Sequence, residues 1–260
     1  MSEVIRLTSS SPSNKPEHCP PELCPLTAYR ELHALFATCR RTKQIGVAVG
    51  PTGSGKTTAA KAYAAADAYS SEVAYLRINT TINAGQPFLN KLCAAVRAYP
   101  PHGSSKADFL DAIKEMIVRS YGVRLIILDE MNHGSGEILH LIRDLWDEAR
   151  CGVVLLGTPE MENLWVRRGK SKSDPFEAFP DRIGQRLDIA RPDSDDVNAL
   201  CRHYDLNGKR ERDMVAASMR KWNGLHGFDR LMENARQLAG EGQPVAAQHL
   251  IDAAELTGAL

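Results

Sequence analysis

The sequence predicts an α/β domain built on a parallel sheet, followed by a small domain made only of helices. Short apolar segments of strand length alternate with helical patterns over residues 27–190, as expected when crossover helices join parallel strands. A glycine-rich turn directly follows the first of these strands and precedes a helix. After Arg191-Pro192 only helical patterns continue. We therefore expect an arm at residues 1–26, an α/β domain at 27–190 and a helical lid domain at 191–260.

The first half of the chain supplies two strands and four helices. Residues 1–26 are rich in Ser, Pro and Asn and are expected to be a flexible arm. Apolar residues at helical spacing then predict a first helix. The expected strands are Gln44–Val49 and Val73–Ile78. The expected helices are Thr27–Cys39, Thr57–Tyr69, Pro87–Ala98 and Lys106–Ser120, the last two separated by a break rich in Gly, Ser and Pro.

The second half completes the sheet and adds the lid. Leu125–Leu128 is entirely apolar, which is typical of a parallel strand covered on both faces. Gly152–Leu156 and a short Leu187–Ile189 follow as strands, with an amphipathic helix at Ile138–Arg150 before them. Gly and Pro breaks then separate four lid helices, Ser194–Tyr204, Glu211–Trp222, Phe228–Leu238 and Val245–Leu256.

Composition excludes several classes of protein. Hydrophobic residues are 43% and charged residues 25% of the 260 residues, as in ordinary globular chains, so wholesale disorder is excluded. No apolar run approaches the roughly 20 residues that a membrane span needs, and residues 1–15 lack the core of a secretory signal. We expect a cytoplasmic protein with no membrane partner.

Charge and cysteine content are uninformative about partners. The 32 basic residues balance the 32 acidic ones, so net charge neither predicts nor excludes nucleic-acid binding. Six cysteines are too few for a disulfide scaffold. His18, Cys19 and Cys24 lie together in the arm, but their spacing is a weak zinc signal and free thiols are the simpler interpretation.

The clearest motif is a phosphate-binding loop. The run Gly50-Pro51-Thr52-Gly53-Ser54-Gly55-Lys56-Thr57, followed by Thr58, matches G-x4-G-K-[ST] between a strand and a helix. Glycines let successive backbone N–H groups point at phosphate oxygens. Lys56 supplies a charge to the β and γ phosphates and Thr57 a hydroxyl to Mg²⁺. ATP and Mg²⁺ are thus the predicted cofactors.

Two carboxylates end the apolar strand at Leu125–Leu128. Asp129 and Glu130 follow it at the sheet edge where open α/β sheets bind ligands. Asp129 is expected to hold the Mg²⁺ shell and Glu130 to orient or deprotonate the attacking water. Glu130 favours ATP hydrolysis over passive binding.

Four further residues are candidates for the reaction. Thr158, directly after the fourth strand, would lie between the two preceding motifs and contact the γ-phosphate or water; a plain Thr-Pro turn is the alternative. Arg182 or Arg186 would reach a neighbouring subunit's nucleotide as an arginine finger, or form surface ion pairs. Arg230 in the lid would reach back to the phosphates, or be a solvated helix residue.

These motifs together resemble the AAA+ superfamily and, within it, the transposition regulators of the phage Mu B, TniB and TnsC group. The resemblance spans roughly residues 27–260 and is carried by Gly50–Thr58, Leu125–His133, Leu155–Met161, Phe179–Leu187 and Gly227–Ala239. It implies an ATPase that assembles as a ring or helical filament on duplex DNA, selects target DNA and recruits a transposase, with a further targeting protein as an additional partner. It also implies Thr158 and Arg230 as sensors and Arg182 as the finger, with Arg186 left open.

Two regions are candidates for DNA contact. Arg167–Lys172 is the densest basic stretch and includes Arg168 and Lys170; it suits phosphate contacts, or is a solvated loop. The two helices after the second strand carry Thr81 and Lys106 at their turns, where similar proteins line a DNA channel. Two other functions stay open at this point: a helicase loader or replication initiator of the same superfamily, and an ATP switch acting on a protein partner only.

Overall fold

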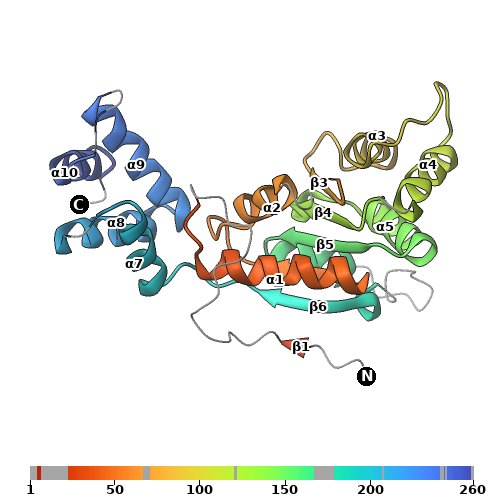
Figure 1. Ribbon diagram of the computed structural model, residues 1–260, viewed down its shortest axis with the longest axis horizontal. Helices are drawn as coiled ribbons and strands as arrows, with labels where there is room; N and C mark the ends of the chain where they lie inside the picture. The colour runs from red at the N-terminus through yellow and green to blue at the C-terminus, as the bar shows by residue number, and fades with distance from the viewer. Residues whose placement is uncertain are drawn as a thin grey trace. The chain divides into compact units, whose positions relative to one another are not determined.

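The computed structural model describes residues 5–6, 23–66, 71–119, 122–166, 179–206, 208–240, 243 and 245–258. The described chain packs as two units (Figure 1). The first contains residues 5–6, 31–50 and 56–188. The second contains residues 23–30, 51–55 and 189–258. Each unit has its own hydrophobic core. The predicted α/β domain and helical lid are both present, with the change between them close to residue 189.

A six-stranded parallel sheet forms the centre of the first unit. Its strand order is β1-β6-β2-β5-β4-β3. The bounds are β1 Ile5–Arg6, β2 Ile45–Val49, β3 Val73–Arg77, β4 Leu125–Asp129, β5 Gly152–Gly157 and β6 Ile183–Asp188. Strands β2, β4 and β5 are buried along their whole length, which explains their unbroken apolar sequences.

Helices of the first unit join and cover these strands (Figure 1). The α-helices are α1 Thr27–Thr42, α2 Lys56–Ala65, α3 Gly85–Val96, α4 Lys106–Val118, α5 Gly136–Ala149 and α6 Asn163–Val166. Three 3-10 turns follow strands or precede β6: η1 Met131–His133, η2 Pro159–Glu162 and η3 Pro180–Arg182. Helix α1 packs closely on the sheet, since a Cβ added at Gly46 would lie 2.6 Å from Cys39 Sγ.

The last strand differs from its prediction. The expected short strand at Leu187–Ile189 is wrong in its bounds, because β6 begins at Ile183 and ends at Asp188. Gly184, Gln185 and Arg186 interrupt the apolar pattern that marks the central strands. Only alternate residues of β6 are fully buried, so hydrophobicity alone gave a weak signal there.

The arm also takes part in the sheet. Ile5 and Arg6 pair in parallel with Gln185 and Arg186 of β6, within the residues expected to form a flexible arm. His18 and Cys19 lie outside the described residues. The Cys24 thiol is half-buried, and Leu26 belongs to the core of the second unit.

The second unit is a bundle of four helices. They are α7 Ser194–His203, α8 Lys209–Lys221, α9 Leu225–Ala239 and α10 Ala247–Leu256. Asp193 caps α7 by accepting hydrogen bonds from the backbone N–H groups of Asp195 and Asp196, at 2.8 and 3.0 Å. Helices α8, α9 and α10 pack on one another. Among the described helices, none is long and apolar enough to cross a membrane.

Candidate ATP site

The predicted phosphate loop joins β2 to α2. Gly53 and Gly55 have φ angles of 78° and 89°, which side-chain-bearing residues adopt only with strain. The loop therefore needs glycine at both positions. Helix α2 begins at Lys56, so its free backbone N–H groups and the positive end of its dipole lie at the loop, as anion binding requires.

Lys56 bridges the two ends of this loop. Its ammonium group donates to the Gly50 carbonyl oxygen at 2.7 Å, and only 9% of the residue is exposed. Burial lowers the pKa of Lys56, while the carboxylates of Asp129 and Glu130 oppose this shift. A buried ammonium beside the phosphate loop is well suited to binding an anion, because a phosphate oxygen is a stronger partner than the Gly50 carbonyl.

The loop glycine Gly53 is also part of the second unit. Its carbonyl oxygen accepts a hydrogen bond from Leu225 N–H at 2.8 Å, at the start of α9. A Cβ at Gly53 would lie 1.7 Å from the Asn223 carbonyl oxygen. Glycine is therefore required at position 53 for two reasons: the Asn223 backbone lies too close for a side chain, and the φ angle is positive. No local sequence pattern indicates this contact.

Asp129, at the end of β4, is a buried acceptor shared by three donors. Thr57 Oγ1 donates to Asp129 Oδ2 at 2.7 Å and the Tyr75 hydroxyl donates to the same oxygen at 2.9 Å. The backbone N–H of Glu130 donates to Oδ1 at 2.9 Å. Asp129 is 1% exposed. The predicted pair of Mg²⁺ residues, Thr57 and Asp129, is thus brought together.

This donor set fits Mg²⁺ bound with a nucleotide. One hydroxyl and one carboxylate, completed by phosphate oxygens and water, are the protein ligands expected in such a site. Within the described part of the chain, no group of three or more His, Cys, Asp or Glu residues is placed to hold a metal by itself.

Tyr75 was not among the predicted site residues. It lies in β3, next to β4 in the sheet. The hydrogen bond and the surrounding burial raise the pKa of its hydroxyl, with burial the larger cause. A single phenol in the otherwise apolar start of a strand is a weak indication of a site residue. It indicates only that a partly buried tyrosine hydroxyl needs a hydrogen-bond partner.

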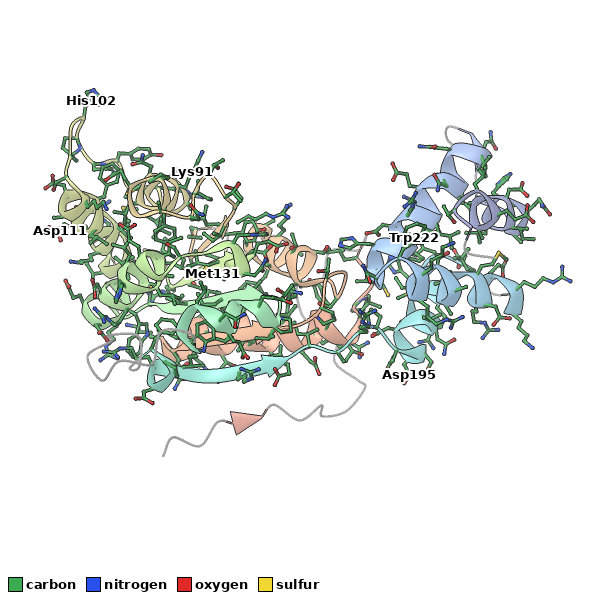
Figure 2. All side chains as sticks on the ribbon, turned by 180° about the vertical axis from the view of Figure 1, so that it is seen from behind. Lys91, His102, Asp111, Met131, Asp195 and Trp222 are labelled. Atoms are coloured by element: carbon green, nitrogen blue, oxygen red, sulfur yellow. The ribbon has the colours of Figure 1, made fainter. Side chains whose placement is uncertain are left out.

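Glu130 follows Asp129 in an unusual backbone conformation. Its φ and ψ angles are 58° and 39°, a left-handed region that costs a non-glycine residue energy and is enriched at functional sites. Met131, next in the chain, is fully buried and is labelled in Figure 2. The Glu130 carboxylate is 28% exposed and lies 3.4 Å from an Arg77 nitrogen. It is accessible to a water molecule.

Thr158 lies between the two motifs, where the sequence predicted a polar residue. Strand β5 pairs with β2 on one side and β4 on the other, and Thr158 is the first residue after it. The Thr158 N–H donates to the Asn132 side-chain oxygen at 3.5 Å. Its hydroxyl hydrogen-bonds to Glu160 and lowers the pKa of that carboxyl. Asn132 is a second polar residue here that the sequence analysis did not select.

Arg182 and Arg186 do not join this site. In the parallel register, Ile45 pairs with Ile183 and Val49 with Asp188. Arg182 therefore lies at the amino edge of the sheet, opposite the edge where the loop follows Val49. Its guanidinium makes two hydrogen bonds to Asp147, at 3.1 and 2.9 Å. Arg186, inside β6, pairs with Asp188 and Glu162.

The remaining candidates contact other side chains or lie outside the described residues. Arg230 on α9 is exposed, and its guanidinium stacks over the Trp222 ring at 4.3 Å from the ring centroid; Trp222 is labelled in Figure 2. Thr81 Oγ1 donates to Asn79 Oδ1 at 2.7 Å. Lys106 pairs with Glu137 at 2.7 Å. Arg168 and Lys170 lie outside the described residues.

Two family models match the chain. An AAA domain model matches residues 39–165, and a model described as Mu B transposition protein, C terminal, matches residues 181–256. The ATP-dependent target DNA activator B of Escherichia phage Mu is 23% identical over 240 residues, covering 89% of this chain and 72% of that protein. The protein of the same name from Escherichia phage D108 is also 23% identical over 240 residues, with the same coverage.

Solved structures show the same fold. The Aeropyrum pernix ORC2 protein, in ADPNP–ADP complexes, superposes with a TM-score of 0.61 at 18% identity and covers 93% of this chain and 70% of that one. Cdc6p from Pyrobaculum aerophilum gives a TM-score of 0.62 at 14% identity, covering 95% and 69%. At these identities the likeness concerns the fold alone.

Proposed function

Because an AAA domain model matches residues 39–165 and a Mu B transposition protein model matches residues 181–256, we propose that this chain is an ATPase that assembles on duplex target DNA and recruits a transposase. The observation that carries the proposal is the hydrogen bond from Thr57 to the buried Asp129, with Glu130 directly beside it. This arrangement joins the phosphate loop to the strand end that holds metal and water in nucleoside triphosphatases.

Each residue of the site has a proposed task. The loop N–H groups and Lys56 bind the phosphates, and Thr57 and Asp129 hold the metal. Bound Mg²⁺ would neutralise charge on the β and γ phosphate oxygens. Glu130 accepts a proton from the attacking water, which its partial exposure admits. Thr158, supported by Asn132, contacts the terminal phosphate. Arg230 is proposed to sense the nucleotide from the lid.

The placement of Arg182 supports self-assembly. A residue at the amino edge of the sheet cannot reach the phosphate loop of its own subunit at the opposite edge. An arginine finger at this position therefore acts on a neighbouring subunit, in a ring or helical filament. Arg186 is less suited to this task, because it pairs with Val47 in the middle of the sheet and not at its amino edge.

DNA binding is proposed to be weak in the single subunit and strong in the assembly. The chain carries no net charge, so contacts from many subunits must add up. Thr81, Lys106, Arg168 and Lys170 are the proposed contacts with the DNA backbone. Phosphate contacts of this kind carry no sequence information and weaken steeply with salt.

The test is nucleotide-dependent binding to a labelled duplex, measured by fluorescence anisotropy with a slowly hydrolysed ATP analogue. The parent protein is expected to bind only with the analogue, and Lys56→Ala is expected to bind neither the analogue nor the duplex. Lys61→Ala, an exposed lysine of the same helix, is the matched control. If the protein binds the analogue but no duplex, the proposed DNA function is wrong. The ATP switch that acts on a protein partner is then the remaining hypothesis. Co-purification with a transposase rather than a helicase tests the partner.

A further inference from the structure

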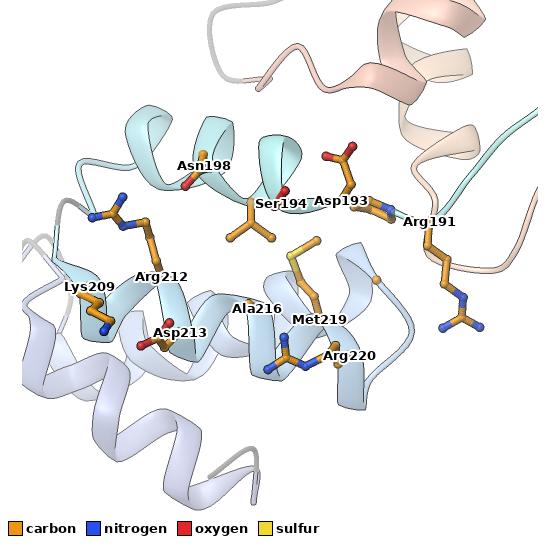
Figure 3. Close-up of a pocket in the computed structure, with 13 residues that line it drawn as sticks. Arg191, Asp193, Ser194, Asn198, Lys209, Arg212, Asp213, Ala216, Met219 and Arg220 are labelled. Atoms are coloured by element: carbon orange, nitrogen blue, oxygen red, sulfur yellow. The ribbon is translucent and has the colours of Figure 1, made fainter.

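The helical unit contains a groove whose lining includes none of the residues proposed to bind ATP. It lies between α7, α8 and the segment leading into α7, and its volume is about 730 Å³. Figure 3 shows Met219 pointing from α8 toward α7, with Ser194 and Asn198 on the α7 side. A groove of this size accommodates several side chains of a bound segment.

The floor of the groove is apolar. Val197 of α7 and Met219 of α8 are 9% and 4% exposed, and Ala216 lies near Met219 on α8. Methionine adapts its shape to different apolar partners. An apolar floor favours a ligand that brings apolar side chains.

The rim of the groove is cationic. Four exposed cations line it: Arg191, Lys209, Arg212 and Arg220. Within the described part of the chain, none of the four forms an ion pair. The two carboxylates in the lining are Asp193 and Asp213, and Asp193 is already used as the helix cap. The rim is therefore short of negative charge.

We propose that this groove binds a segment of a protein partner in which acidic side chains alternate with apolar ones. The apolar side chains would cover Val197, Ala216 and Met219, and the carboxylates would pair with the rim arginines, which bind carboxylates with two hydrogen bonds. A DNA backbone would use the cations but leave the apolar floor without a partner. The proposal goes beyond the ATPase and does not require nucleotide.

The experiment uses the full-length protein and short fluorescein-labelled peptides. One peptide contains glutamate and leucine, a second contains lysine and leucine, and a third contains glutamate and serine. The parent protein is expected to bind the first peptide about tenfold more tightly than either of the others. Equal binding of the glutamate–leucine and lysine–leucine peptides would overturn the proposal.

Charge reversal locates the site. The double variant Arg212→Glu, Arg220→Glu is expected to weaken binding of the glutamate–leucine peptide about tenfold or more, and Ala216→Gln to weaken it by placing an amide on the apolar floor. Arg210→Glu, on the same helix but outside the lining, is the matched control and should leave binding unchanged. If the double variant loses duplex DNA binding but keeps the peptide, the groove is a nucleic-acid site and the proposal is wrong.

A second measurement covers the case of a variant that does not fold. A benzophenone derivative of the glutamate–leucine peptide is cross-linked to the parent protein and the adducts are mapped by mass spectrometry. Adducts on α7 and α8 support the proposal, whereas adducts confined to other parts of the chain overturn it. Because the peptide-binding and cross-linking arms use no ATP, their failure is distinct from failure of the proposed ATPase.

Discussion

The Thr57 hydroxyl donates to the Asp129 carboxylate across 2.7 Å, joining the first turn of α2 to the end of β4. The two residues come from motifs far apart in the sequence, and each motif alone is a common feature of α/β proteins. The direct contact between Thr57 and Asp129 brings the two motifs together in one site.

The first prediction concerns this hydroxyl. Thr57→Ala is expected to reduce Mg²⁺-dependent ATP binding about 10–100-fold, because the metal loses one of its two protein ligands. Thr57→Ser keeps the hydroxyl and should stay close to the parent. Calorimetric titration with ATP over a range of Mg²⁺ concentrations measures both variants. Equal losses in both would mean that the methyl group, not the oxygen, is important.

The second prediction concerns Tyr75, which donates to the same carboxylate oxygen. Tyr75→Phe should lower the free energy of unfolding by about 1 kcal/mol, the usual worth of one hydrogen bond. It should also raise the Mg²⁺ concentration needed for half-maximal ATP hydrolysis about tenfold, since partners of a metal ligand orient that ligand. Tyr99→Phe is the control, because Tyr99 is 86% exposed. A loss of stability with an unchanged Mg²⁺ requirement would limit Tyr75 to a packing role.

The third prediction separates binding from chemistry. Glu130→Gln should bind ATP as tightly as the parent but hydrolyse it about 100-fold or more slowly, the usual contribution of a general base. The assembled state should then persist after ATP is added. Phosphate release and light scattering follow the two effects, with Glu115→Gln, an exposed residue of α4, as the control. Hydrolysis at the parent rate would refute the assignment of Glu130.

The fourth prediction tests the arginine finger. Arg182→Ala should bind ATP normally but hydrolyse it slowly, and mixing it with Lys56→Ala should restore part of the activity. In the mixture, an intact loop of one subunit can face an intact Arg182 of another.

Two controls distinguish this from loss of an ion pair. Asp147→Asn removes the partner of Arg182 but leaves the arginine, so it should retain hydrolysis. If Asp147→Asn and Arg182→Ala lose activity together, Arg182 is structural. If Arg186→Ala behaves as expected of Arg182→Ala, the finger is Arg186.

The sequence predicted the features that depend on strong local patterns. The buried strands β2, β4 and β5 are continuous apolar runs, and the phosphate loop is a fixed motif, so both were found. Strand β6 was misplaced because Gly184, Gln185 and Arg186 hide its pattern. Strand β1 was missed because its two residues, which pair with β6, are too few to show an alternation of apolar and polar side chains.

The parts of the site that escaped prediction depend on distant contacts. Tyr75 reaches Asp129 only because β3 and β4 are neighbours in the sheet, and Asn132 reaches Thr158 only because β5 lies beside β4. The contact between Gly53 and Leu225 joins two segments that lie far apart in the sequence. Such pairings follow from topology, which no local pattern specifies.

The most direct test of the account is electron microscopy of negatively stained protein mixed with duplex DNA, with and without a slowly hydrolysed ATP analogue. We expect rings or filaments on the DNA only when the analogue is present, because assembly is proposed to depend on nucleotide. A protein that stays monomeric and free of DNA in both samples would contradict it, and the ATP site would then belong to a switch that acts on a protein partner.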